Sequence, residues 1–279
     1  DAKEVKLRGK KYLTDRKKYP SKEAAYKLVC SKCFKTEEKM LHAAVEVDTL
    51  KDYLEKNLEN EYMVINWLVP GYYTVVNLYV RTLENGKDPA FDKLIDTFRR
   101  GDDKFRSSRF KLLPKLLEAP SAIVVLLRTV IGTLRPVLIG NKLTCYHYTG
   151  KNYMEVDIDT GSSFFVCHLA SSMVRAFQGI VVNQGFAIEG RDESELPERM
   201  LGIQCYSRIS IEKIIIQLGQ HQSKTREKNE GDRRQRWGFF TKDASRSPTA
   251  SKKGFERNAR DSVEGDEVIR TRRVSSLKS

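Results

Sequence analysis

Cysteine is scarce in this 279-residue chain, and the number present is odd. An odd count argues against a disulfide framework and for a reducing compartment. Cys30 and Cys33 have the spacing of half a zinc site, but no second pair follows at a usable spacing. We therefore expect no structural zinc. The five thiols belong to Cys30, Cys33, Cys145, Cys167 and Cys205.

The chain also lacks a long apolar segment free of charge. Its longest apolar run, residues 121–139, contains Arg128 near the middle and Arg135 near the end. A central arginine costs about 2.5–3.5 kcal/mol on insertion into a bilayer. We therefore expect this run to be a buried element of a soluble domain.

Signatures of catalysis are missing or incomplete. The sequence has no glycine-rich phosphate loop, no nucleotide-binding fingerprint and no G-x-S-x-G turn. Asp159-Thr160-Gly161 matches the loop of aspartic proteases, but those enzymes need two carboxylates and no second such tripeptide occurs. We expect no enzymatic activity and no cofactor.

Two cysteines and two histidines could in principle form a catalytic thiol–imidazole pair. Cys145 and His147 lie in an apolar, tyrosine-rich stretch, where a buried cysteine and a hydrogen-bonded core histidine are the commoner outcome. Cys167 and His168 complete the set. A hydrolase that uses Asp159 or this set is the weakest alternative that we keep.

Positive charge is in excess, and it is concentrated at the two ends. Residues 1–22 hold nine Lys or Arg against three Asp or Glu, and residues 219–279 hold sixteen against nine. The middle, 23–218, holds 25 of each, within a total net charge of +13. This layout is typical of a neutral globular body with anion-seeking flanks.

A change of composition at Gly219 divides the chain. Beyond it, charged residues mix with Ser, Asn and Gln without helical or strand periodicity, so this part cannot bury enough apolar surface to offset its ordering entropy. We predict a globular domain over 1–218 and a disordered basic tail over 219–279. Ser247 and Ser275 in that tail resemble phosphorylation sites.

Runs rich in Val, Ile and Tyr, bounded by turn residues, predict strands over 27–34, 62–69, 73–80, 142–149 and 152–159. Short turns, Pro70-Gly71 and Gly150-Lys151, join four of these runs in pairs. The sequence therefore predicts two hairpins and a mainly antiparallel sheet.

Helices are expected between these strands. Asp88-Pro89 provides an N-cap and a first-turn proline, apolar residues recur from Phe91 to Phe98, and Gly101 ends the pattern. A second helix is expected around Leu50, Tyr53, Leu54 and Leu58, and a third from Ser162 or Ser163. Hairpins packed with several helices, without strict strand–helix alternation, predict an α+β fold.

Three carboxylates are spaced two residues apart in the last predicted strand. Glu155, Asp157 and Asp159 therefore share one face, and Met154, Val156 and Ile158 share the other. The glycine-spaced oxygen loop of a calcium site does not accompany them. We expect a structural role, with Thr160-Gly161 turning the chain.

The strongest local charge lies in residues 99–115, with a net charge of +5. In a predicted strand, Arg109 and Lys111 share one face above the apolar Phe110 and Leu112, which suits recognition of phosphate or carboxylate groups. The alternative is a core strand whose basic face pairs internally with Asp102 and Asp103. The candidate anion-binding and lipid-binding residues are Arg99, Arg100, Lys104, Arg106, Arg109, Lys111 and Lys115.

Four blocks of sequence carry a family resemblance, with phrases such as DPAFD, GDDKFR, RFKLLP, NYMEVDID and EGRDESELPE. The chain resembles the C-terminal domain of plant enhanced disease resistance 2 proteins. Residues 118–121 read Glu-Ala-Pro-Ser where that family usually has Glu-Gly-Pro-Trp, so a pocket formed by the tryptophan would be altered here. The blocks are 7–20, 88–120, 140–163 and 186–211.

The resemblance implies a function through the modules that accompany the domain. In plants it commonly follows a pleckstrin-homology module and a steroidogenic-acute-regulatory-related lipid-transfer (START) module, both directed to lipids. It supplies no catalytic residue. A START-like arrangement is one form of the α+β fold that we consider.

We therefore expect a non-enzymatic, cytoplasmic protein that associates peripherally with membranes. Anionic lipids, phosphoinositides among them, would meet the 99–115 cluster and segment 6–18, and an acyl or sterol-like ligand in an apolar cavity is a further expectation. The alternative is a signalling scaffold whose basic flanks bind acidic proteins, with nucleic acid the less favoured partner.

Overall fold

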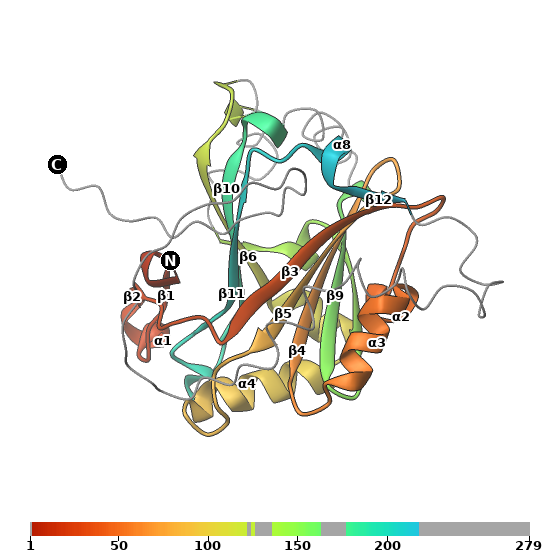
Figure 1. The fold of residues 1–279 in the computed structure, drawn as a ribbon. Helices are drawn as coiled ribbons and strands as arrows, with labels where there is room; N and C mark the ends of the chain where they lie inside the picture. The colour runs from red at the N-terminus through yellow and green to blue at the C-terminus, as the bar shows by residue number, and fades with distance from the viewer. Residues whose placement is uncertain (1, 122–123, 126–135, 163–176, 218–279) are drawn as a thin grey trace, which may run out of the picture. The chain divides into compact units, whose positions relative to one another are not determined.

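The computed structural model describes residues 2–121, 124–125, 136–162 and 177–217 (Figure 1). The largest sheet of this part has six strands. In spatial order they are β12 (Ile215–Gln217), β3 (Tyr26–Lys35), β5 (Tyr73–Arg81), β4 (Tyr62–Val69), β9 (Tyr153–Asp159) and β8 (Thr144–Thr149).

A second sheet and a small hairpin complete the strands. The second sheet is antiparallel, in the order β11 (Met200–Ser207), β10 (Val181–Ile188), β6 (Phe110–Glu118) and β7 (Val137–Leu138). The hairpin pairs β1 (Lys6–Arg8) with β2 (Lys18–Pro20) and has the short helix α1 (Tyr12–Asp15) between them.

Both predicted hairpins are confirmed. β4 and β5 are joined at Pro70-Gly71, where Gly71 has φ +86°, a conformation that favours glycine. β8 and β9 pair antiparallel on either side of Gly150. The two hairpins then join through a parallel pairing of β4 with β9, in which Val64 lies opposite Glu155. Alternation along each strand predicts its buried face but does not select this neighbour.

The main core lies between the two large sheets and is completed by α4 (Pro89–Arg100). Phe91, Leu94, Ile95 and Phe98 of α4 are buried there, as the apolar spacing predicts, and Asp88 accepts a hydrogen bond from Phe91 N as the N-cap. From the two strands β6 and β10, Phe110 and Phe186 stack with ring centroids 5.6 Å apart. Each such side chain contributes about 1.5–3 kcal/mol by burial.

A chain of buried hydrogen bonds links the two sheets at β11. Tyr79 Oη donates to Gln204 Oε1 at 2.5 Å, and Tyr206 Oη donates to Asn77 Oδ1 at 2.7 Å. Gln204 Nε2 donates in turn to Tyr206 Oη at 2.5 Å. Because an unsatisfied buried polar group is costly, this network favours one alignment of β11 against β5.

The opposite face of the six-stranded sheet is covered by α2 (Ala43–Glu46) and α3 (Asp48–Lys56), which Figure 1 shows beside β9. Leu50, Tyr53 and Leu54 are buried as predicted, and the Tyr53 ring meets the Tyr62 ring edge-on at 5.7 Å. The prediction for Leu58 is wrong. The helix ends at Lys56, and Leu58 is 45% exposed.

Short elements connect these parts, and the α+β class is confirmed. Several predictions lie outside the described residues: the helix expected after Ser163, most of the run 121–139, and the tail 219–279 with Ser247 and Ser275. The short elements are α5 (Asp103–Arg109), α8 (Ile211–Ile214) and the 3-10 turns Ala2–Glu4, Ile139–Asn141, Thr160–Ser162, Phe177–Gly179 and Glu193–Glu195.

Candidate anion-binding surface

The two most central cations of the 99–115 cluster are engaged inside the protein. Arg109 Nη1 lies 2.6 Å from Glu195 Oε2 and donates to the Glu189 carbonyl at 3.0 Å. Lys111 is only 6% exposed, and its Nζ lies 2.5 Å from Glu198 Oε1. Burial lowers the pKa of Lys111, and the charge of Glu198 opposes this shift.

Arg8 of the N-terminal hairpin joins the same set. Its Nη2 lies 2.9 Å from Glu189 Oε2, its Nη1 donates to the Gly190 carbonyl at 2.8 Å, and its Nε lies 3.5 Å from Glu198 Oε1. We call Arg8, Arg109 and Lys111 with Glu189, Glu195 and Glu198 the internal ion-pair network. It joins the hairpin, the end of α5, β6 and the β10–β11 connection.

The structure places Arg109 at the end of α5 and Lys111 in β6, so the expectation of one strand that carries both is wrong, and so are the partners proposed for them. Asp102 caps α5 by accepting from Phe105 N at 2.7 Å, while the carboxylates that pair with the cations come from the Glu-rich stretch 189–198. The β6–β10 register places Phe110 opposite Ile188, so Glu189 follows directly beside Arg109. The high content of acidic residues in 189–198 is the sequence feature that could have indicated these partners.

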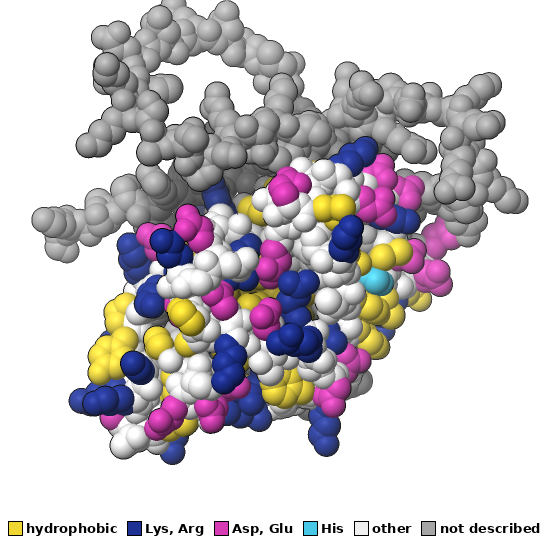
Figure 2. Space-filling view, turned by 90° about the horizontal axis from the view of Figure 1, so that it is seen from below, with side chains coloured by type: hydrophobic (Ala, Val, Ile, Leu, Met, Phe, Trp, Pro, Cys, Tyr) yellow, Lys and Arg dark blue, Asp and Glu magenta, His cyan; other side chains and the backbone are white. Residues whose placement is uncertain are grey.

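The remaining members of the cluster are dispersed. Arg99 lies 3.4 Å from Glu61, Lys115 lies 2.9 Å from Glu4, and Arg106 donates to the Gly101 carbonyl at 2.7 Å. Arg100 and Lys104 are exposed and form no ion pair within the described part of the chain. On the face shown in Figure 2, cationic and acidic side chains are intermixed. A role in lipid binding stays a prediction for this cluster.

The N-terminal basic hairpin, residues 6–20, is arranged differently. Six of its cations are exposed, and none forms an ion pair with a described residue. Tyr19 beside them is 54% exposed. The structure therefore presents concentrated positive charge next to an exposed aromatic ring. The six cations are Lys6, Lys10, Lys11, Arg16, Lys17 and Lys18.

Local chemistry holds this hairpin in shape. Arg16 adopts a left-handed conformation with φ +57° and ends α1. The guanidinium of Arg8 lies 4.7 Å from the centre of the Tyr12 ring, a cation–π arrangement. A Cβ atom at Gly9 would lie 2.5 Å from the Tyr19 ring, so a larger residue here would displace that ring. Leu7 is buried and anchors the hairpin on its inner side.

The acidic strand β9 has the predicted two faces. Glu155, Asp157 and Asp159 are nonetheless all buried, because residues 39–47 lie across them. Asp159 is held by Lys39 Nζ at 2.6 Å and accepts from Gly161 N at 2.9 Å, which makes the Asp-Thr-Gly segment a capped strand end. This is the structural role expected from the sequence.

The other candidate reactive groups lie in buried surroundings. Burial raises the pKa of Cys145 to about 12, and burial lowers the pKa of His147 to about 4 with a further contribution from Arg106. His147 Nε2 lies 3.0 Å from Ser107 Oγ. Cys167 and His168 lie outside the described residues. Within the described ranges, no group of His, Cys, Asp or Glu is arranged to hold a metal ion.

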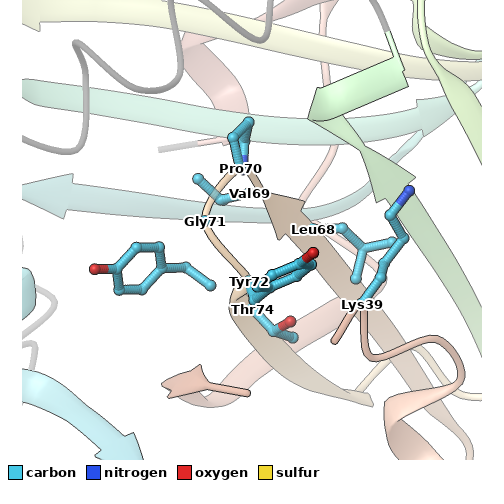
Figure 3. Close-up of a pocket in the computed structure, with 8 residues that line it drawn as sticks. Lys39, Leu68, Val69, Pro70, Gly71, Tyr72 and Thr74 are labelled. Atoms are coloured by element: carbon cyan, nitrogen blue, oxygen red, sulfur yellow. The ribbon is translucent and has the colours of Figure 1, made fainter. Parts of the chain in front are cut away.

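A small pocket lies at the β4–β5 turn (Figure 3). Leu68, Pro70, Tyr72 and Thr74 line it together with Lys39, whose ammonium group is paired with Asp159. Its volume is about 80 Å³, whereas pockets for small-molecule ligands usually measure about 300–1,000 Å³. This pocket is too small for the acyl or sterol-like ligand expected from the sequence.

These features define a class: an α+β domain of two packed sheets with a basic hairpin fixed to one end by buried ion pairs. Residues 1–210 match the family described as "Protein ENHANCED DISEASE RESISTANCE 2, C-terminal". The chain belongs to this family, which confirms the resemblance drawn from its sequence blocks.

One similar protein is "Protein ENHANCED DISEASE RESISTANCE 2-like" from Arabidopsis thaliana, which is 31% identical over 219 residues. The match covers 77% of this chain and 29% of that protein, so the chain spans less than a third of the relative's length. No solved structure matches the chain, and a START-like arrangement stays a prediction. Among the described residues, no helix has the length and apolar character needed to span a membrane.

Proposed function

We propose that this domain is a non-enzymatic module that binds anionic membrane lipids, with the N-terminal basic hairpin as its contact surface. One observation carries the proposal: six exposed cations without ion-pair partners in the described chain lie next to an exposed tyrosine. Lysine and arginine contribute electrostatic attraction, and tyrosine favours the interface between headgroups and acyl chains.

The location of the lipid-binding surface follows from which cations already have ion-pair partners inside the protein. Arg109 and Lys111 are neutralised by the largely buried carboxylates of Glu195 and Glu198 and would be costly to release, because separating a buried ion pair leaves an uncompensated charge. The six exposed cations of the hairpin have no such partners among the described residues. We therefore assign headgroup contact to segment 6–20, and Arg100 and Lys104 are secondary candidates.

The electrostatic free energy available from the hairpin is sufficient for reversible association with a membrane. Each Lys or Arg near an anionic membrane contributes about 1 kcal/mol. Replacing Lys10 and Lys11 by alanine should therefore weaken binding by about 2 kcal/mol, or roughly 30-fold. Because these residues are exposed on the turn side of the hairpin and form no ion pair with a described residue, the fold should be retained.

Sedimentation with vesicles tests the proposal. Wild type, the Lys10→Ala/Lys11→Ala variant and a matched Lys51→Ala/Lys56→Ala control on the exposed side of α3 would be mixed with phosphatidylcholine vesicles, with or without phosphoinositide. The control removes the same charge from another surface. We expect binding that rises with phosphoinositide content and falls only for the hairpin variant.

Two results would overturn it in different ways. Equal weakening in both double variants would show that net charge is responsible and the hairpin has no special role. Absence of binding to any anionic vesicle, with binding to an acidic polypeptide such as polyglutamate, would favour the scaffold function.

A further inference from the structure

The inference concerns residues 39–47, which we call the covering segment, and the strand β9 beneath it. Three contacts fix the segment on the carboxylates of β9: Lys39 Nζ to Asp159 Oδ2 at 2.6 Å, His42 N to Asp157 Oδ2 at 2.7 Å, and Ala44 N to Glu155 Oε2 at 3.1 Å. These carboxylates thus provide polar attachment points for the segment.

The backbone of the segment is shaped for this contact. His42 has φ +56°, in the left-handed region, and this conformation turns successive N–H groups to one side. The His42 ring stacks on Tyr148 with centroids 4.1 Å apart, and its Nε2 lies 2.9 Å from Tyr153 Oη. Asn66 Nδ2 donates to the Met40 carbonyl at 3.1 Å.

Beneath the segment, Glu155 and Asp157 form a buried carboxylate pair. They are 1% and 0% exposed, and each has one oxygen without a hydrogen-bond partner, Glu155 Oε1 and Asp157 Oδ1. The amide oxygen of Asn66, opposite Asp157 in the sheet, also lacks a partner. Two adjacent buried carboxylates cannot both be ionised at low cost, and a proton between them would satisfy the unpartnered oxygens.

Among the residues that the structure describes, no group around the pair supplies a compensating cation. Lys39 is paired with Asp159, and the pKa of His42 is lowered by burial while Glu46 acts in the opposite direction. His42 Nε2 is 3.9 Å from Glu155 Oε2. The remaining ionisable groups that face the pair from β8 and β9 are tyrosines: Tyr146 and Tyr148 lie opposite Asp157 and Glu155, and Tyr153 lies beside His42.

We propose that a single proton shared by Glu155 and Asp157 holds the covering segment closed, and that its loss as the pH rises opens the segment. The device is a pH-sensitive cover on the outer face of the six-stranded sheet. It rests on the buried pair and its contacts alone and is independent of the proposed lipid binding.

The direction of the pH dependence follows from the buried environment of the two carboxyl groups. Burial raises the pKa of both carboxyl groups, and the charge of Asp157 raises that of Glu155 further. A group whose pKa is raised on folding stabilises the closed state fully below its unfolded pKa and loses that effect as pH rises through the folded pKa. Between these two pKa values, the equilibrium constant for closing of the covering segment should fall by about tenfold per pH unit for each proton released on opening.

Hydrogen–deuterium exchange tests the proposal. Protection factors, which correct for the pH dependence of chemical exchange, would be measured from a pH of about 5 to about 8.5, on the alkaline side of ordinary carboxyl pKa values. We compare peptides from 39–47 with peptides from β5. We expect protection of the covering segment to fall with pH in the wild type while that of β5 is constant.

Two variants separate the proton from the other contacts. Glu155→Gln keeps an acceptor for Ala44 N and removes one of the two carboxyl groups, so protection of the covering segment should fall less with pH than in the wild type, because only Asp157 is left to lose a proton. Lys39→Ala removes the Asp159 ion pair and should lower protection equally at each pH, leaving the slope unchanged. Protection that is flat in the wild type, or that falls equally in Glu155→Gln, would refute the proposal.

A measurement on the wild type alone guards against misfolding of the variants. Difference infrared spectroscopy at a pH of about 7 should show a protonated carboxyl band, since ordinary Asp and Glu side chains are ionised there. A spectrum of fully ionised carboxylates would overturn the proposal by itself.

Discussion

Removal of Glu198 is the sharpest test of the internal ion-pair network. The Glu198 side chain is 1% exposed and accepts from Lys111 Nζ at 2.5 Å, from Gly190 N at 3.1 Å and from Arg8 N at 3.3 Å. The Glu198→Ala variant leaves two backbone donors without their acceptor and a buried ammonium group whose remaining ion-pair partner is Glu189, 3.6 Å away. Breaking a buried ion pair in this way costs about 3–5 kcal/mol.

The reverse substitution should cost less. In Lys111→Met, Glu198 keeps the contacts with Arg8 and Gly190, and methionine fills most of the volume of the lysine stem. We expect a loss of about 1–3 kcal/mol, in the range for a polar group left with one partner fewer. The double variant Lys111→Met/Glu198→Ala removes both charges and should be closer to the wild type than Glu198→Ala is, because it leaves no ammonium group buried without its partner.

Urea unfolding followed by circular dichroism measures these differences, and the two single variants with the double variant form a double-mutant cycle. If Glu198→Ala loses less than about 1 kcal/mol, the network is not a significant source of stability. Additivity of the two single effects would also contradict the reasoning, because residues in direct contact should be coupled.

Two further substitutions test the core and the start of α4. Gly202→Ala would place a Cβ 2.9 Å from the ring of the fully buried Tyr79, so we expect a loss of about 1–3 kcal/mol in the same urea assay, and an unchanged midpoint would contradict this close packing. At Asp88, burial is outweighed by hydrogen bonds from Arg199 and Lys22, which lower its pKa. Ionised Asp88 should therefore contribute to the free energy of unfolding above the carboxyl pKa of the unfolded chain. This contribution should disappear as the pH falls through the lower pKa of the folded state. Asp88→Asn, which keeps the cap and loses the charge, should therefore be destabilised at neutral pH but equal to the wild type in acid, and a difference that persists in acid would refute this.

Local patterns were sufficient for several elements of this domain, whereas β10, β11 and the helix α5 were not predicted. The hairpins around Gly71 and Gly150, the cap and buried stripe of α4, and the two faces of β9 all depend on residues within a few positions of one another. Periodicity and turn chemistry act over that same range, and so they are legible in the sequence alone. The acidic strand end at Asp159 was also recognised as structural for this reason.

The tertiary structure decided how those elements meet and which charges are free. From the sequence, Arg109 and Lys111 are predicted to form a basic surface. In the fold, the pairing of β6 with β10 brings them to carboxylates that are 86 and 87 residues further along the chain. The covering segment likewise reaches Glu155 and Asp157 across more than a hundred residues, |i−j| 111 and 115. Coulomb attraction and desolvation depend on distance in space, so neutralised and exposed cations look alike in the sequence and differ only once the chain is folded.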